Sequence, residues 1–157
     1  MLKILSTMME WLRPGGIVVI YFFAQYLGTD AISEFHILGP IVVILMSGTV
    51  AFESLILGVA GSEKIGYTPN RAYQVQSGLN NLATAVAALL VFVLDWGLYA
   101  DATVVTVMLL FFSFSAVNHT VTAIREHNMK TVNLMRPIMA LLLLGLLLPP
   151  MISALMQ

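Results

Sequence analysis

Polar side chains that could bind a solute or an ion stand inside the long apolar segments of this 157-residue sequence. Six of them lie about 5–10 Å inside one end of their segments, if each residue adds about 1.5 Å along a helix. These six are Glu53, Gln76, Asn80, Asn118, His119 and Arg136. A polar group that faces acyl chains carries a large desolvation cost, so we expect the six to face one another or a water-filled recess. This layer predicts a binding site for a small polar solute or ion.

The same residues also have structural interpretations. Asn80 and Asn81 could be interhelical hydrogen-bonding residues, which contribute about 0.6 kcal/mol each. Glu53 could form an ion pair with Arg136 or remain protonated and neutral. The residue types alone do not choose between these interpretations and a binding site.

Metal and catalytic chemistry have weaker support. His119 and Glu126 are seven residues apart, which returns within about 20° of the same helix direction. With Glu53 they make a conceivable divalent-metal site, but two ligands on one helix are a thin basis, and we assign no metal ligand. The sequence lacks a nucleophile elbow, an HExxH motif and a phosphate-binding glycine loop. It also has no cysteine, which excludes thiolate chemistry and disulfides. We therefore assign no catalytic residue and no cofactor, and the sequence leans against an enzyme.

The composition specifies the elements that must hold these residues. Hydrophobic residues make up 59% of the chain and charged residues 10%, which is typical of a polytopic membrane protein. A membrane span needs about 20 mainly apolar residues. Five segments fit, at residues 15–29, 37–60, 73–94, 102–124 and 132–156. We predict an all-α helix bundle in which residues 1–157 form a single integral membrane domain.

The N-terminal residues do not have the continuous apolar sequence of a membrane span. Glu10, Arg13 and the sequence Pro14-Gly15-Gly16 interrupt the first segment, which argues against a cleavable signal peptide. Apolar residues recur at helical spacing over residues 2–12 and predict a short amphipathic helix at the membrane surface, residues 1–13. The alternative is an extension of the first span that is kinked at Pro14.

Basic residues predict the orientation of the bundle. All seven Lys and Arg residues fall before the first span or in the second-to-third and fourth-to-fifth connections with their flanks. The charged residues in the other two connections are all acidic, and His36 is the only other titratable basic side chain there. Because Lys and Arg near span ends are retained in the cytoplasm, we expect a cytoplasmic N-terminus and a periplasmic C-terminus in a bacterial inner membrane. The slight net charge of −1 gives no indication of nucleic-acid binding.

Small residues indicate which helices pack closely, because helices in lipid approach one another through small side chains. Such residues recur at spacings of three and four in the second, third and fourth spans, for example at Ser47, Ala51 and Ser54. We expect these three helices to form the inner bundle. The Leu-rich fifth span, with Pro149 and Pro150, is expected at the periphery or in an oligomer contact.

The segments "YTPNRAYQVQSGLNNLATAVAALL" and "SAVNHTVTAI" resemble the DoxX-like superfamily of small bacterial membrane proteins, in its uncharacterised branch. The resemblance covers residues 37–145 and implies a four-helix core within the five spans. Some such families are linked to quinone or thiol redox systems. Asn118-His119 stands where the relatives have Gly-His, and Gln76 stands where they often have Glu, so a proton or metal role of that acid does not carry over.

Three functional hypotheses follow. The leading one is a small inner-membrane protein that binds or transports a polar solute or ion in a cytoplasm-facing recess. The second is a non-catalytic accessory subunit in which the polar layer only fixes helix register, with a homo-oligomer or a membrane complex as partner. A quinone- or lipid-dependent enzyme is the third, and no complete catalytic set supports it.

Overall fold

The computed structural model describes residues 2–157 and is entirely helical in its regular structure. Residue 1, with which the predicted surface segment 1–13 begins, lies outside this range. In the described part the helices are α1 (Leu2–Leu27), α2 (Ala31–Ile56), α3 (Gly58–Ile65), α4 (Arg71–Val93), α5 (Leu98–Arg125) and α6 (Thr131–Leu155).

Short polar sequences set the helix boundaries. Asp30 caps α2 by accepting a hydrogen bond from the Ser33 backbone N–H at 2.7 Å, and Ser33 returns the contact in a capping box. Asn70 caps α4 in the same manner through the Tyr73 N–H. Gly66 ends α3 in the left-handed region at φ 82°, where a side chain would be strained.

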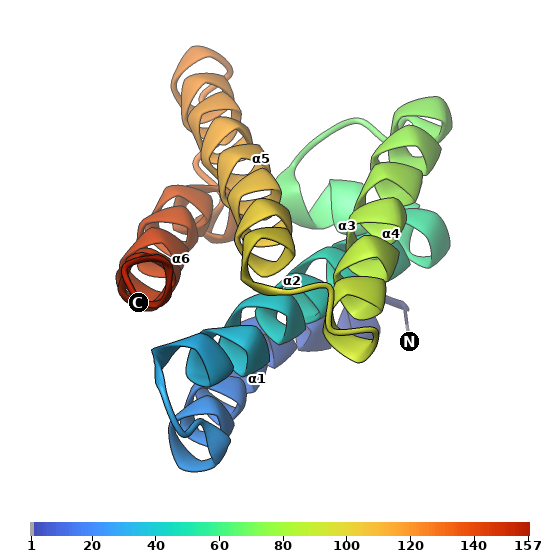
Figure 1. Ribbon diagram of the computed structural model, residues 1–157. Coiled ribbons are helices and arrows are strands. Elements are labelled where there is room, and N and C mark those ends of the chain that lie inside the picture. Colours follow the sequence, from blue (N-terminus) through green and yellow to red (C-terminus); the bar gives the residue numbers. More distant parts are fainter. Residues whose placement is uncertain (1) are drawn as a thin grey trace.

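Helix α2 lies at the centre of the bundle (Figure 1). Helix α1 runs antiparallel beside it, α4 packs closely along it, and α6 packs against both α5 and α2. The apolar core gathers around α2, where Phe35, Leu38, Val42 and Val43 are fully buried. By contrast, α4 and α5 touch lightly and diverge from their shared loop (Figure 1).

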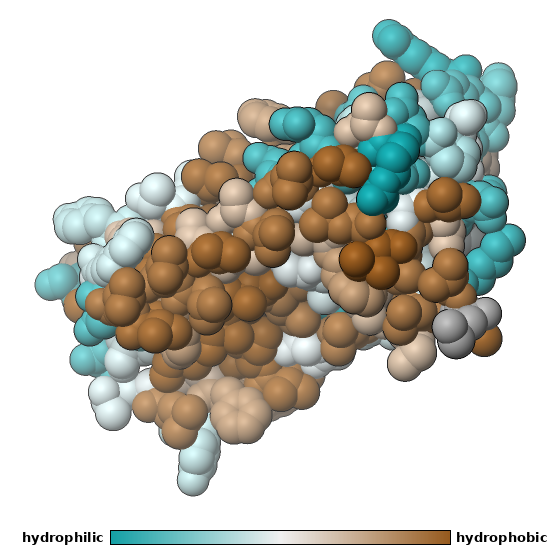
Figure 2. Space-filling view, turned by 90° about the vertical axis from the view of Figure 1, so that its right-hand side faces the viewer, coloured by the Kyte–Doolittle hydropathy of each residue, from teal (hydrophilic) through white to brown (hydrophobic). Residues whose placement is uncertain are grey.

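Among the described residues, α2, α4, α5 and α6 are long and apolar enough to cross a membrane. This confirms an all-helical bundle with helices suited to a membrane, and the four helices match four of the five predicted spans in position. The segment predicted as 37–60 is divided, because α2 ends at Ile56 and α3 begins at Gly58. Figure 2 shows an apolar belt between two more polar ends.

The predicted interruption at Pro14 is wrong, and α1 is one continuous helix with Pro14 inside it, as in the alternative in which residues 1–13 extend the next helix. Contacts on both sides of the proline hold α1 against α2: the Ser6 hydroxyl donates to Glu53, and Arg13 Nε donates to Thr49 at 3.0 Å. Proline within a helix removes one backbone hydrogen bond, so side-chain contacts with the neighbouring helix matter more here. A fifth span through residues 15–29 remains a prediction.

The amphipathic pattern of α1 has its polar face turned inward. Ser6 and Arg13 are buried, whereas Leu2, Leu12 and Trp11 are exposed. A helix in water would place these groups the other way round. The inverted arrangement is expected where the outer face meets lipid and the inner face meets polar partners. A position at the membrane surface for residues 1–13 remains a prediction.

The small-residue faces are confirmed for the contact between α2 and α4. Ser47, Ala51, Asn81 and Ala88 are buried there, and a Cβ on Gly78 would lie 2.6 Å from Leu55 Cγ. Helix α6 buries Leu143 and Leu147 against the core, but it is the least buried of the four candidate spans, which agrees with the expected peripheral position. These two leucines face α2 and α5. Helix α6 contacts each of these helices more extensively than α4 contacts α5.

Candidate functional site

Glu53 is the centre of a buried group of charges near the C-terminal end of α2. Its Oε2 accepts a hydrogen bond from Arg13 Nη2 at 2.8 Å. Its Oε1 accepts from the Ser6 hydroxyl at 2.5 Å and from the Lys64 ammonium group. Both carboxylate oxygens therefore have donors, which come from α1 and α3.

Glu10 links this group to α6. It lies 3.1 Å from Arg13 Nη1, 2.8 Å from Lys64 Nζ and 3.0 Å from Arg136 Nη2. Burial by itself raises the pKa of Glu10, but the positive charges of Arg136, Arg13 and Lys64 outweigh it and lower the pKa to about 2. Glu10 is therefore ionised at neutral pH.

We call Glu10, Arg13, Glu53, Lys64 and Arg136 the ionic cluster. Their side chains are between 3% and 25% exposed, so water screens these charges only in part. Three cations face two carboxylates, which leaves one net positive charge. The cluster ties α1, α2, α3 and α6 together at one end of the bundle.

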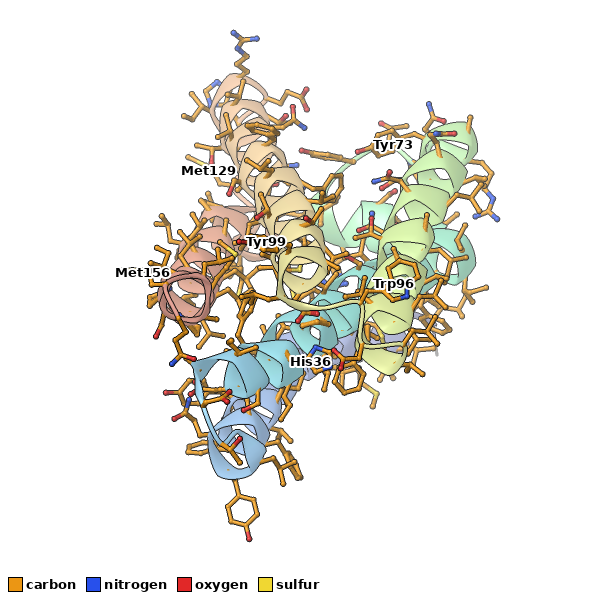
Figure 3. The ribbon with its side chains drawn as sticks, in the orientation of Figure 1. His36, Tyr73, Trp96, Tyr99, Met129 and Met156 are labelled. Atoms are coloured by element: carbon orange, nitrogen blue, oxygen red, sulfur yellow. The ribbon has the colours of Figure 1, made fainter. Side chains whose placement is uncertain are left out.

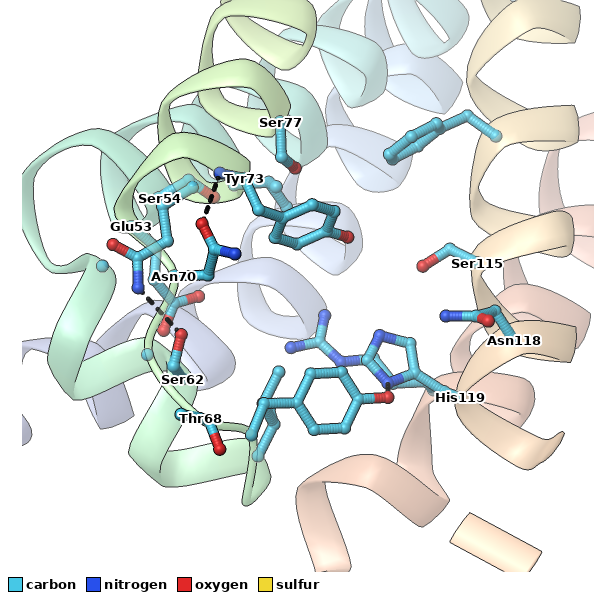
Figure 4. Close-up of a pocket in the computed structure, with 18 of the residues that line it drawn as sticks. Glu53, Ser54, Ser62, Thr68, Asn70, Tyr73, Ser77, Ser115, Asn118 and His119 are labelled. Atoms are coloured by element: carbon cyan, nitrogen blue, oxygen red, sulfur yellow. Dashed lines mark hydrogen bonds between the residues drawn. The ribbon is translucent and has the colours of Figure 1, made fainter. Parts of the chain in front are cut away.

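A polar cavity of about 160 Å³ adjoins the ionic cluster (Figure 4). Residues of α2 and α3 line one side and residues of α5 line the other, with α4 and the α3–α4 loop completing the wall. Arg136 reaches it from α6. Its polar lining includes Glu53, Ser62, Gln74, Ser115, Asn118 and His119.

His119 is held in one orientation by its neighbours. The Asn133 amide nitrogen donates to the Asn128 carbonyl at 3.1 Å, so Asn133 Oδ1 faces His119 Nδ1 at 2.6 Å. Nδ1 therefore carries a proton, and Nε2 is an acceptor when the ring is neutral. The Tyr67 ring stacks on the imidazole with centroids 5.6 Å apart, and its hydroxyl lies 3.2 Å from Nδ1. Because Nδ1 already donates to Asn133, the Tyr67 O–H can turn to another acceptor.

The structure brings together four of the six residues predicted for the site. Glu53, Asn118, His119 and Arg136 line the polar cavity. Gln76 and Asn80 do not, because both lie on the exposed face of α4. The expectation that they face the cavity is wrong: the inward face carries Gln74, Gly78 and Asn81, which follow one another at spacings of four and three.

The structure also corrects two of the structural interpretations, the ion pair of Glu53 and the interhelical hydrogen bond of Asn81. Glu53 does form ion pairs, but with Arg13 and Lys64, while Arg136 pairs with Glu10. Buried Asn81 donates to the Ser77 carbonyl within its own helix at 2.9 Å, and so does not bond to another helix through that amide nitrogen.

Sequence reasoning missed the partners of Glu53. Ser6 and Arg13 belong, together with Glu10, to a segment expected at the membrane surface, and Lys64 belongs to the predicted connection between the second and third spans. The spacing of Ser6, Glu10 and Arg13, four and then three residues, places them on one face of a helix and was the available signal.

The candidate metal ligands do not meet. Among residues 2–157, no three His, Asp or Glu side chains come together in a way that could hold a metal ion. His119 contacts Tyr67 and Asn133, and Glu126 is exposed beyond the end of α5.

A second polar pair lies at the opposite end of the bundle. His36 Nδ1 on α2 is 2.9 Å from Asp101 Oδ2 on α5, and Asp101 is 1% exposed. The His36 ring stacks on Phe92 of α4 with centroids 5.1 Å apart. Figure 3 labels His36 near the α4–α5 loop, where Trp96 and Tyr99 are exposed.

A family model described as a family of unknown function (DUF6790) matches residues 28–156, and the chain belongs to this family. No match was found among curated proteins or among solved structures.

Proposed function

For this member of a family without an assigned activity, we propose that the protein binds or transports a small polar solute or ion in the polar cavity, as a small multi-pass protein of the bacterial inner membrane. The observation that carries this proposal is the cavity beside the ionic cluster, lined by His119, Tyr67 and Asn118 with hydrogen-bonding capacity left for a ligand. A concave site with a few convergent polar groups is the usual form of a small-molecule site.

The distribution of charge supports a cytoplasmic opening. Lys3 pairs with Glu63 at 3.1 Å, Lys130 donates to the Glu63 carbonyl at 2.6 Å, and Arg71 donates to the Leu55 carbonyl at 3.1 Å. These three cations and the ionic cluster share one end of the bundle. We infer that this end faces the cytoplasm, with α1 as a fifth span through residues 15–29 and the C-terminus in the periplasm.

The resemblance to the DoxX-like superfamily remains a proposal about ancestry. It would give α2, α4, α5 and α6 the role of the four-helix core, and it adds no substrate.

A second candidate function has one observation in its favour. All contacts of the Glu53 carboxylate are internal, which fits a polar layer that fixes helix register in an accessory subunit. The exposed Leu141 and Leu142 of α6 offer a surface for a membrane partner or a second copy. Native mass spectrometry separates the two: a retained small molecule on a monomer favours binding, and a stable partner or oligomer without one favours the accessory role.

The binding proposal is tested by filling the cavity. Ser77→Leu extends an α4 side chain into it, and Ala83→Leu adds a similar side chain on the exposed face of the same helix. Thermal unfolding is followed against a panel of cations, anions, sugars and amino acids. A ligand at 100 times its Kd stabilises the folded state by about 2.7 kcal/mol.

We expect at least one class of solute to raise the Tm of the parent and of Ala83→Leu but not of Ser77→Leu. Ser115→Leu provides a second filling variant from the α5 side. A panel without any shift, or a shift that survives both filling variants, contradicts the proposal.

A further inference from the structure

The ligand class can be narrowed from the charges and donors around the polar cavity. This step rests on the proposed function, since it concerns the same site. We infer that the cavity binds a singly charged oxyanion, with the Arg136 guanidinium as its principal contact.

The ionic cluster lacks one negative charge. Arg13, Lys64 and Arg136 contribute three positive charges, and Glu10 and Glu53 contribute two negative charges. A net charge held away from water is unfavourable unless a counter-charge accompanies it. One bound anion in the adjoining cavity brings the total to zero, whereas a cation would raise it to two.

Arg136 has hydrogen-bonding capacity left for this anion. Its Nη2 donates to Glu10, but its Nε is buried and has no hydrogen-bond partner within residues 2–157. A buried guanidinium nitrogen without a partner is unusual in a native protein. Arg136 also lines a smaller cavity of about 50 Å³ next to the first, so that its side chain borders both spaces. Guanidinium groups bind carboxylates and phosphates in the plane of their N–H bonds.

The neighbouring polar groups are compatible with an anion. The Tyr67 hydroxyl can donate into the cavity, and the Asn118 amide faces it (Figure 4). The Glu53 oxygens already accept from Arg13, Lys64 and Ser6, so their charge is directed at those donors rather than at the cavity. His119 Nε2 can accept a hydrogen bond from a ligand hydroxyl.

The volume of the polar cavity favours a compact ligand. The cavity of about 160 Å³ compares with the engineered apolar cavity of about 150 Å³ that admits benzene. It is bordered by aromatic rings of Tyr73 and Phe111, between the two helices that diverge in Figure 1. A small free carboxylate fits this space. The phosphodiester of an anionic lipid presents the same chemistry and could enter between α4 and α5.

The test is calorimetric titration of the full-length protein in a neutral detergent. Sodium acetate and sodium benzoate are compared with acetamide and benzamide, which have similar shapes and no charge. Arg136→Lys keeps the positive charge and removes Nε, and Arg71→Gln removes a cation at the same end that lies outside the cavity.

We expect an acid to bind more tightly than its amide. Arg136→Lys should weaken acid binding about tenfold or more, since a hydrogen bond to a charged group is lost. Arg71→Gln should bind as the parent does. Glu10→Gln removes a negative charge and frees Arg136 Nη2, so it should bind the acid about tenfold more tightly. This variant keeps the test decisive if Arg136→Lys does not fold.

A parallel arm identifies the source of the anion. Nanodiscs with phosphatidylglycerol or phosphatidylcholine are analysed by native mass spectrometry. Retention of phosphatidylglycerol alone, lost in Arg136→Lys, supports the lipid source even if acetate and benzoate do not bind. Acid binding in lipid-free detergent supports a free anion.

Three results overturn the inference. If cations or neutral solutes bind in the cavity and neither carboxylates nor phosphatidylglycerol do, the ligand class is wrong while the proposed function stands. If no class of solute binds, both fail together. Acid binding that is unchanged in Arg136→Lys and in Glu10→Gln likewise removes Arg136 and the charge balance from the explanation.

Discussion

Removing a negative charge from the ionic cluster should cost more stability than removing a positive one. Glu53→Gln changes a side chain of nearly the same shape, and Lys64→Met removes a cation with little loss of apolar volume. The first leaves three cations against Glu10 alone, a net charge of +2. The second leaves two cations and two carboxylates, a net charge of zero.

The contacts that remain in each variant determine how much stability it is expected to lose. In Glu53→Gln, an amide nitrogen must replace one carboxylate oxygen and would meet Arg13 or Lys64, both of which are donors. Loss of one partner from a buried ion pair costs about 3–5 kcal/mol. In Lys64→Met, Glu53 retains Arg13 and Ser6, and Glu10 retains Arg13. The expected loss is about 1–2 kcal/mol, as for ordinary hydrogen bonds.

The measurement is reversible unfolding in mixed detergent micelles, followed by circular dichroism in a buffer without carboxylate or phosphate. Lys3→Met, which removes an exposed cation at the same end, is the control and should change stability by less than about 1 kcal/mol. If Lys64→Met is as destabilising as Glu53→Gln or more so, the cluster carries no excess of positive charge and the charge argument fails.

Three further predictions concern other parts of the molecule. His36→Leu should destabilise by about 3–5 kcal/mol because buried Asp101 loses its partner, and adding Asp101→Leu should recover most of that loss; equal stability of the single and double variants in the same unfolding assay would contradict this. Because the chain has no cysteine, Thr29→Cys and Thr68→Cys report sidedness: an impermeant maleimide should label Thr29→Cys on intact cells and Thr68→Cys only after lysis, and labelling of both from outside would refute the orientation. The lowered pKa of Glu10 stabilises the folded state above its ordinary pKa of 4.5, and this contribution is lost as the pH falls towards about 2; the Tm of the parent should therefore fall more steeply below pH 4.5 than that of Glu10→Gln, and parallel curves would refute the assignment.

How far the sequence predicts this structure depends on the range of the interaction. The apolar segments of α2, α4, α5 and α6 depend on local composition, and the sequence predicts their ends to within about six residues. The sequence does not predict which face of α4 points inward. Gln74 and Gln76 are the same residue type and differ only in the face of the helix on which they lie. The inward face depends on the close contact of Gly78 with Leu55 of α2, which is separated from it by more than twenty residues.

The ionic cluster could not be predicted from the sequence for a related reason. A depth estimate treats each span separately and places Glu10 and Arg13 among the headgroups, where charges need no partner. The structure instead continues α1 through Pro14 and lays its polar face on α2, so that a buried acid finds donors from a helix about forty residues away. In lipid the apolar face of α1 gains little by packing inward, whereas its charged face gains hydrogen bonds that the membrane cannot provide. Polar residues on an amphipathic segment next to a span with a lone acid are therefore candidates for that acid's partners, and here Ser6 and Arg13 are the two that α1 supplies to Glu53.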